Sequence, residues 1–206
     1  MNQNTFCANL YIEYRNAKLG SVNLILYHGT LDRYADSIKR DGIILSKSKK
    51  FLDFGPGFYL TEDYNFACET AKRRSFKNNQ FPKNEKSFPA VIKLKYNPSI
   101  CCFSRQFLSP DKEWGTFIYN NRHKNEKALI CNLGLCLHNR AGIYDIVSGP
   151  IADGNVIAYF DTKVIGMTET ILNNISPKKD DPFQVSFHTE TAITALEFLS
   201  YNIIRG

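Results

Sequence analysis

The sequence predicts a single α+β domain built around a twisted, mainly antiparallel β-sheet with flanking helices. Short segments of strand composition are mixed with amphipathic helical segments, and turns rich in glycine and proline separate them. No internal repeat or low-complexity tract is present. The chain has 206 residues, of which 43% are hydrophobic and 22% charged, so it is long enough to bury one sizeable core. We therefore expect one domain over residues 1–206, with its core at about 24–199.

The segment up to residue 61 contains two expected strands and one expected helix. Val22–His28 is a nearly continuous apolar run, which indicates a buried strand. Leu31–Asp41 has apolar residues at helical spacing, and Gly42 follows its last turn, as glycine commonly does at helix ends. Asp53–Thr61 begins with a Gly-Pro-Gly turn and continues into Phe58–Thr61, whose residues favour a half-buried strand.

The next sixty residues predict two helices, a loop and a strand. Thr61 is followed by acids, so we expect it to cap a helix that continues to about Arg74. Phe76–Phe88 is polar and carries Asn, Lys and Pro, which is typical of a surface loop. Ala90–Tyr96 alternates apolar and polar residues like a strand. Asp111–Arg122 has acids in its first turn and aromatic residues on one helical face, so we expect a helix packed on the sheet.

The last third of the chain predicts two further strands. Tyr144–Gly149 has strand composition and ends in a turn, and Phe183–His188 alternates with period two. Residues Asn155–Tyr159 and Thr162–Thr170 are expected to form a helix and a connector. A final helix is expected over Thr191–Leu199, with Thr189 at its entry.

The charge and the cysteines restrict the classes of partner. The net charge of +6 suits an anionic ligand or nucleic acid, but the excess is modest and comes partly from local runs such as Lys47–Lys50, which also fit solvated loops. The six cysteines have no CxxC or metal-finger spacing, so we expect reduced core residues and no metal. The N-terminus carries no secretion signal, and no apolar run reaches the ~18 residues that span a membrane. A cytoplasmic protein without membrane contact is expected.

Four segments place polar or aromatic side chains at strand ends, where binding sites commonly form. They are Tyr27–Thr30, Gly57–Tyr59, Asp145–Asp153 and Gln184–Thr189. Each has a structural explanation when taken alone. His28 suits a hydrogen-bonded histidine at a strand end, and Tyr59 suits a core position. His188 precedes a helix entry, so a structural role is favoured for it.

Taken in order, Tyr27-His-Gly-Thr30, Asp53–Thr61, Tyr144–Asp153 and Gln184–Thr189 resemble the ADP-ribosyltransferase fold. The similar branch has the signature His, Tyr and then Glu or a substitute, and includes poly(ADP-ribose) polymerases and bacterial DNA-modifying toxins. The chain resembles more closely still a bacterial family of unknown function assigned to this fold. The resemblance spans about residues 24 to 199.

This resemblance implies a mono-ADP-ribosyltransferase that uses NAD as its substrate and modifies an acceptor protein or nucleic acid. His28 would hydrogen-bond the adenosine ribose, the Gly29 backbone would hold the nicotinamide amide, and Tyr59 would stack on the nicotinamide ring. Thr30 and Gly57 complete the expected NAD contacts. Basic residues of Ser46–Lys50 or Arg73-Arg74 would meet the pyrophosphate. An antitoxin-like protein partner is a further expectation for a toxin.

The third signature position departs from the better-known enzymes, because Gln184 stands where they have glutamate. An amide accepts the same hydrogen bond from the ribose but brings no full negative charge. Single transfer is therefore favoured over glycohydrolysis or chain elongation. Asp153 is the expected second acid, and Glu190 is the weaker candidate because Thr189 ends the strand. Two alternatives stay open, a non-catalytic NAD-binding module that acts through a protein partner and a relative of the NAD-dependent RNA 2′-phosphotransferases.

Overall fold

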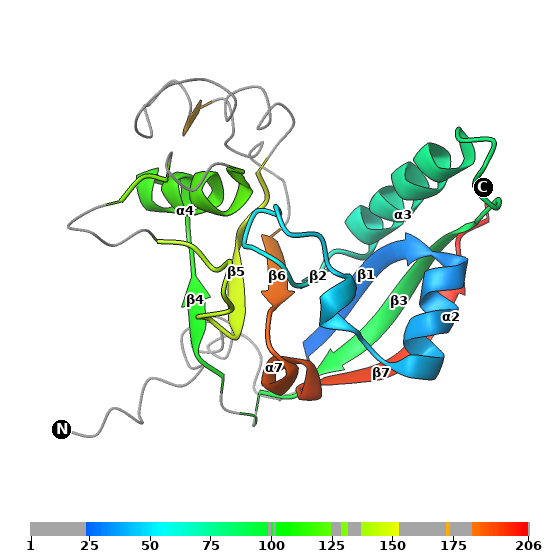
Figure 1. The fold of residues 1–206 in the computed structure, drawn as a ribbon. Helices are drawn as coiled ribbons and strands as arrows, with labels where there is room; N and C mark the ends of the chain where they lie inside the picture. Colours follow the sequence, from blue (N-terminus) through cyan, green and yellow to red (C-terminus); the bar gives the residue numbers. More distant parts are fainter. Residues whose placement is uncertain are drawn as a thin grey trace.

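The fold is a seven-stranded sheet flanked by helices on both faces (Figure 1). The computed structural model describes residues 24–98, 100, 102–124, 129–131, 137–152, 172–173 and 183–205. The strand order is β4-β5-β6-β2-β1-β3-β7, and all neighbours are antiparallel except β4 and β5. The strands are β1 (Leu24–Leu31), β2 (Phe58–Thr61), β3 (Pro89–Tyr96), β4 (Ser104–Gln106), β5 (Ile146–Pro150), β6 (Phe183–Phe187) and β7 (Leu196–Ile203). The α+β class with a mainly antiparallel sheet is confirmed.

The helices divide between the two faces of the sheet. They are α2 (Asp32–Asp41), α3 (Tyr64–Asn79), α4 (Lys112–Arg122) and α7 (Glu190–Thr194), with a 3-10 turn η2 (Leu45–Lys47). Ala35 of α2 and Ala192 of α7 pack into the core on one face, whereas α3 and α4 lie along the opposite face, at the top of Figure 1. The α2 helix and the Thr189 cap of α7, which accepts from Ala192 N, agree with the sequence prediction.

Apolar alternation along the strands creates two main cores. The first lies under α2 and α7 and includes Leu26, Ile92, Leu94, Phe58, Leu60, Val185 and Phe187. The second lies under α4 and consists of Phe54, Phe107, Trp114, Phe117, Ile118, Tyr119, Val147 and Ala152. Trp114 Nε1 also donates to Pro150 O at 3.0 Å, which ties α4 to β5. The second core therefore sits on the same end of the sheet as β6 and the Asp53–Gly57 turn.

The sheet is split between β1 and β2. β1 pairs with β3 along its full length, from Leu24↔Tyr96 to Leu31↔Pro89, but it pairs with β2 at a single register position, Tyr27↔Thr61. Beyond that position the two strands diverge, so backbone groups on the facing edges need other partners. The site described below is built on the two walls of this split.

Helix α3 is longer than predicted and is capped by a later residue. It runs to Asn79, into the segment expected to be a loop, because Ser75 Oγ and Asn79 Nδ2 both donate to Ser87 O, at 2.7 and 3.0 Å. These tertiary hydrogen bonds hold a polar helix end that has no apolar periodicity. The cap is Asp63, which accepts from Phe66 N, and the expected cap Thr61 stays in β2.

The end of the chain is a strand where a helix was predicted. The expected helix Thr191–Leu199 ends at Thr194, and Leu196–Ile203 forms β7 on the free edge of β3. A hydrogen-bonded edge partner outweighs local helical spacing there. Smaller shifts affect two other strands. β1 extends three residues past His28, the predicted end, and β5 is Ile146–Pro150 where Tyr144–Gly149 was predicted. A further short strand, β4, lies at Ser104–Gln106.

Two further predictions concern cysteines and residues beyond the described part. Cys68 and Cys102 are free, and Cys102 is buried, as expected for reduced core residues. Cys131 is a correction, because it is disulfide-bonded and not reduced. The helix and connector predicted over 155–170 lie outside the residues that the structure describes.

Among the described helices, none has the length and apolar character needed to cross a bilayer.

Candidate functional site

Three adjacent strands carry the three predicted signature residues. His28 lies on β1, Tyr59 on the neighbouring β2, and Gln184 on β6 next to it. Thr61 is the register partner of Gln184, and Tyr59 is the partner of Ser186, so Tyr59 and Gln184 share one face of the sheet as diagonal neighbours. His28 stands across the split from Tyr59. The fold therefore brings together residues that are far apart in the chain.

His28 bridges the split through its imidazole ring. Its Nδ1 lies 2.7 Å from Tyr59 O, and its ring stacks on Phe58 with centroids 4.5 Å apart. A carbonyl oxygen only accepts, so Nδ1 carries the proton and Nε2 is an acceptor. Arg74 Nη1 lies 3.3 Å from Nε2. Burial, helped by the Arg74 charge, lowers the pKa of His28 to about 3. The ring is therefore neutral at pH 7 and presents an acceptor nitrogen.

Arg74 holds the carbonyl of Gly29, the residue whose backbone the family resemblance assigns to the nicotinamide amide. Arg74 Nη1 donates to Gly29 O at 2.9 Å. A Cβ on Gly29 would lie 2.1 Å from Ala67 O, so α3 packs directly against this backbone. Arg73, the other predicted pyrophosphate contact on α3, instead lies over the Phe66 ring and donates to Thr70 Oγ1. Of the two arginines, Arg74 is the one at the split.

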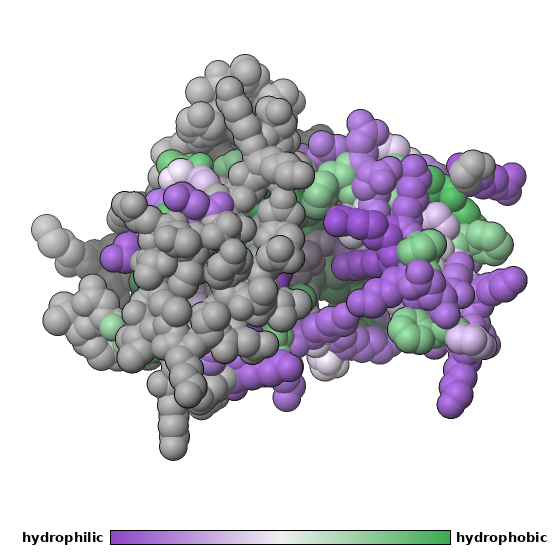
Figure 2. All heavy atoms as spheres, turned by 90° about the horizontal axis from the view of Figure 1, so that it is seen from above, coloured by the Kyte–Doolittle hydropathy of each residue, from purple (hydrophilic) through white to green (hydrophobic). Residues whose placement is uncertain are grey.

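The face of α3 that points away from the sheet is exposed to solvent. Its exposed lysines and arginines belong to the mainly hydrophilic surface over α3 that Figure 2 shows from above. The basic side chains of this helix are therefore part of the solvated surface. The predicted basic loop Ser46–Lys50 is also largely exposed.

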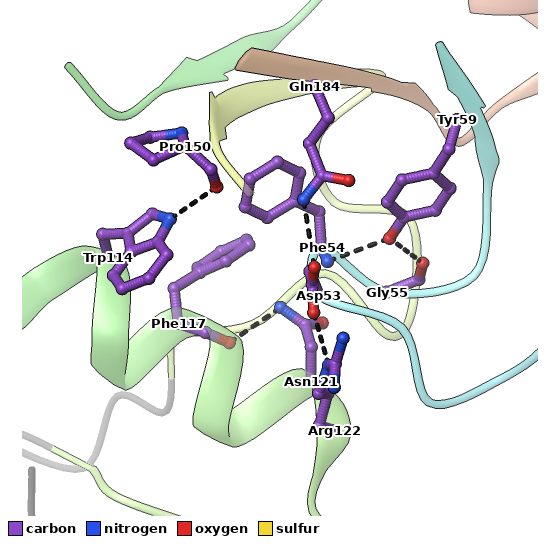
Figure 3. Close-up of polar contacts among 10 residues, drawn as sticks. All are labelled: Asp53, Phe54, Gly55, Tyr59, Trp114, Phe117, Asn121, Arg122, Pro150 and Gln184. Atoms are coloured by element: carbon purple, nitrogen blue, oxygen red, sulfur yellow. Dashed lines mark hydrogen bonds and ion pairs between the residues drawn. The ribbon is translucent and has the colours of Figure 1, made fainter. Parts of the chain in front are cut away.

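Tyr59 is fixed by the turn that precedes it. Its hydroxyl accepts from Phe54 N at 2.9 Å and donates to Gly55 O at 2.7 Å (Figure 3). Burial, and the nearby Asp53 charge, hold the pKa of this phenol well above its ordinary value, so it stays protonated. Gly55 has a φ of +92°, which favours glycine. The Gly-Pro-Gly turn thus closes on the phenol and orients the ring.

Gly57 and His188 form the structural base of this turn. Gly57 N donates to Ser48 Oγ at 2.8 Å, and a Cβ on Gly57 would lie 2.6 Å from His188 Nδ1. His188 is buried, with Nδ1 2.7 Å from Pro56 O and Nε2 2.7 Å from Ser186 Oγ. These contacts support the structural role expected of His188. The backbone N–H of Gly57 is therefore engaged by the Ser48 hydroxyl.

Gln184 contacts an acid that the sequence did not single out. Gln184 Nε2 donates to Asp53 Oδ2 at 3.1 Å, and the other oxygen of Asp53 forms an ion pair with Arg122 at the end of α4 (Figure 3). Asp53 is only 6% exposed. Asp53 opens the Asp-Phe-Gly segment and Arg122 ends a predicted helix, but nothing in the sequence indicates that they meet. The acid beside Gln184 is thus Asp53.

The remaining predicted residues have different outcomes. Thr30 follows Gly29 on β1 and is buried. Glu190 lies in the first turn of α7, after β6 has ended, as the Thr189 cap predicted. Asp153, the expected second acid, lies outside the described residues.

A cavity of about 360 Å³ lies next to the turn. Its lining residues are Leu45, Ser46, Pro56, Arg140, Ala141, Gly142, His188 and Thr189. None of the three signature residues lines it, and the histidine in its lining, His188, already has both ring nitrogens engaged. Within the described residues, no group of three or more His, Cys, Asp or Glu side chains is placed to hold a metal ion.

Two histidines with lowered pKa values make stability depend on pH. Burial lowers the pKa of His188 to about 4, and that of His28 to about 3, from an ordinary value of 6.5. At a pH between the folded-state pKa and the ordinary pKa of 6.5, the unfolded chain binds more protons than the folded protein. The contribution of these histidines to stability is therefore fully present well above pH 6.5 and is lost as the pH falls. From pH 7 to 5 we expect a loss of about 2 kcal/mol per histidine. Urea unfolding at both pH values measures it, and His28→Gln should remove about half of the difference. Equal stability at pH 7 and 5 in the unmodified protein contradicts this expectation.

Fold and site together define an α+β protein with a split sheet and a His, Tyr, Gln set on three adjacent strands. The model of the family "Protein of unknown function (DUF3990)" matches residues 24–198, and the chain belongs to that family. No curated protein and no solved structure matches the chain significantly.

Proposed function

We propose that this protein is a mono-ADP-ribosyltransferase that transfers ADP-ribose from NAD to a macromolecular acceptor. The observation that carries the proposal is the split between β1 and β2, with His28 on one wall and Tyr59 on the other. Gln184 on the next strand adds an amide on the Tyr59 side. The order of these residues along the chain and across the sheet fits the His, Tyr, Glu or Gln signature that the sequence resembles.

The proposed reaction requires no general acid, because the nicotinamide of NAD is already cationic and leaves as a neutral molecule. The C1′–N bond of the nicotinamide ribose breaks, its electron pair leaves with neutral nicotinamide, and the acceptor nucleophile bonds to C1′ and loses a proton. The ribose passes through an oxocarbenium-like state, as in glycoside cleavage. The protein therefore has to position NAD and stabilise positive charge on the sugar. A site of neutral hydrogen-bonding groups on rigid strands suits the positioning part.

The residues of the split fit specific parts of NAD. The acceptor Nε2 of His28 suits a ribose hydroxyl, which can donate to it. The guanidinium of Arg74 suits the pyrophosphate, and on binding it would exchange the Gly29 carbonyl for phosphate oxygens. That exchange frees the carbonyl for the nicotinamide amide. Tyr59 offers an aromatic ring fixed by two hydrogen bonds, a suitable platform for the nicotinamide.

A second candidate function is NAD binding without turnover, with action through a protein partner. It is favoured by the charge of the site, because the amide of Gln184 is neutral and the carboxylate beside it is ion-paired with Arg122. A transferase needs only enough transition-state stabilisation for one slow transfer, whereas a binding module needs none. Consumption of NAD separates the two.

The test is transfer of labelled ADP-ribose from NAD to the protein, DNA and RNA fractions of a bacterial lysate. We expect His28→Ala, Tyr59→Ala and Gln184→Ala each to reduce transfer by about tenfold or more. Tyr59→Phe keeps the ring, so it should keep NAD binding. Tyr34→Ala is the matched control, because Tyr34 is 51% exposed on α2, and it should behave like the unmodified protein.

Three outcomes are informative. Transfer that survives both His28→Ala and Tyr59→Ala rejects the site. NAD binding without NAD consumption by the unmodified protein favours the binding module. A protein that neither binds nor consumes NAD rejects both proposals. Circular dichroism of each variant separates loss of activity from loss of fold.

A further inference from the structure

Asp53 is placed to control the orientation of the Gln184 side chain. One carboxylate oxygen accepts from Gln184 Nε2 at 3.1 Å, and the other is ion-paired with Arg122. Asp53 is 6% exposed and lies at the start of the turn that fixes Tyr59. It is thus a buried acid between α4 and the two strands of the site.

A carboxylate can only accept, so the end of the Gln184 amide that faces Asp53 has to be the NH2 group. The carbonyl oxygen Oε1 then occupies the other end. Figure 3 shows Oε1 pointing toward Tyr59, away from Asp53. An acceptor therefore faces the side on which the nicotinamide ribose is expected. With the amide turned over, a donor would face that side instead.

The charge of Asp53 is balanced by Arg122, which limits its electrostatic role. A carboxylate and a guanidinium in contact present almost no net charge to a sugar farther away. The hydrogen bond from Gln184 Nε2 to Asp53 is not weakened in this way, because it depends on direct contact. Of the two effects that Asp53 can exert on the ribose, orientation of Gln184 is therefore the larger.

We infer that Asp53 is a positioning residue of this site, which holds Gln184 with its carbonyl oxygen toward the ribose hydroxyl of the substrate. The inference rests on the proposed NAD-dependent transfer. It explains how an amide at the third signature position keeps the acceptor function of a glutamate.

The substitution Asp53→Asn tests the orientation with almost no change in shape. Arg122 remains a donor and selects the carbonyl oxygen of the introduced asparagine, so the asparagine NH2 group faces Gln184 as a donor. Gln184 then turns over to accept from it, and its NH2 group replaces Oε1 toward Tyr59. We expect kcat for transfer to fall by about tenfold to a hundredfold, with a smaller change in the KM for NAD.

The double variant Asp53→Asn/Gln184→Glu should restore the acceptor. A glutamate has an oxygen at both ends, so one accepts from the introduced asparagine and the other faces the ribose. We expect it to recover the transfer rate lost in Asp53→Asn and to gain NAD hydrolysis. Gln184→Glu alone places two carboxylates in contact and should be less stable than the double variant.

The experiment measures kcat and KM for transfer in the unmodified protein, the two single variants and the double variant. Glu113→Gln is the matched control, because Glu113 on the same helix α4 pairs with Arg105 at the surface, and its kinetics should not change. The expected result is a fall in kcat for Asp53→Asn and its recovery in the double variant. Unchanged kcat in Asp53→Asn, or no recovery in a folded double variant, overturns the inference.

The side-chain amide signals of Gln184 in a ¹H–¹⁵N spectrum test the same inference without NAD. They are assigned by their loss in Gln184→Glu. A marked shift of these signals in Asp53→Asn is expected, and unchanged signals overturn the role of Asp53. Absence of NAD turnover in the unmodified protein, with the shift present, would instead count against the proposed function alone.

Discussion

Replacing Arg122 by alanine is expected to lower the free energy of unfolding by about 3 kcal/mol. The substitution leaves the Asp53 carboxylate buried without its cation, and breaking a buried ion pair from one side costs about 3–5 kcal/mol. The lower end applies because the Arg122 side chain is 23% exposed, so water already reaches part of the pair.

Urea unfolding measures this effect, and two further variants locate its cause. Asp53→Asn/Arg122→Ala removes the stranded charge and should recover more than half of the loss. Arg105→Ala breaks the exposed pair with Glu113 and should cost less than about 1 kcal/mol. If Arg122→Ala and Arg105→Ala cost the same, the Asp53–Arg122 pair is not a buried pair.

The second large effect is expected from Gly29→Ala, which should cost about 3 kcal/mol. The new methyl group would lie 2.1 Å from Ala67 O and 2.9 Å from Ala71 N, both backbone atoms of α3. Backbone cannot rotate away as a side chain does, so α3 has to move off β1, and overpacking of this kind costs about 1–3 kcal/mol or more. Arg74 moves with α3, so the contact with Gly29 O should weaken too.

Thermal unfolding and NAD binding of Gly29→Ala are compared with Gly42→Ala. Gly42 has a φ of +79° and a ψ of −176°, with open space around its Cβ position, so alanine there carries backbone strain of about 1–3 kcal/mol and no collision. A Gly29→Ala variant as stable as the unmodified protein would mean that α3 does not pack on the β1 backbone.

The local elements of the fold were predictable because their signals are local. Apolar spacing and Gly42 define α2, and the alternation of Ala90–Tyr96 defines most of β3. The errors arise where tertiary contacts decide. Ser87, far outside the helical pattern, extends α3 to Asn79, and the free edge of β3 turns Leu196–Ile203 into a strand.

The candidate site shows the same division. His28, Tyr59 and Gln184 could be chosen from the sequence because the ordered segments that contain them resemble a known fold, and the strand order places them on neighbouring strands. The contact between Asp53 and Gln184 spans 131 residues, so no local pattern indicates it. Arg122 has the properties of an ordinary last-turn cation, and only the position of α4 over the sheet directs it to Asp53.

The split between β1 and β2 also determines where the sheet yields most easily. Separating β1 from β3 would break a ladder eight residues long, whereas separating β1 from β2 breaks one register pair and the His28 hydrogen bond. Separation of β1 from β2 breaks few backbone hydrogen bonds, so we expect local opening of the sheet to occur there first. A ligand that contacts both β1 and β2 would hold the two strands together, so its binding would raise the free energy of unfolding.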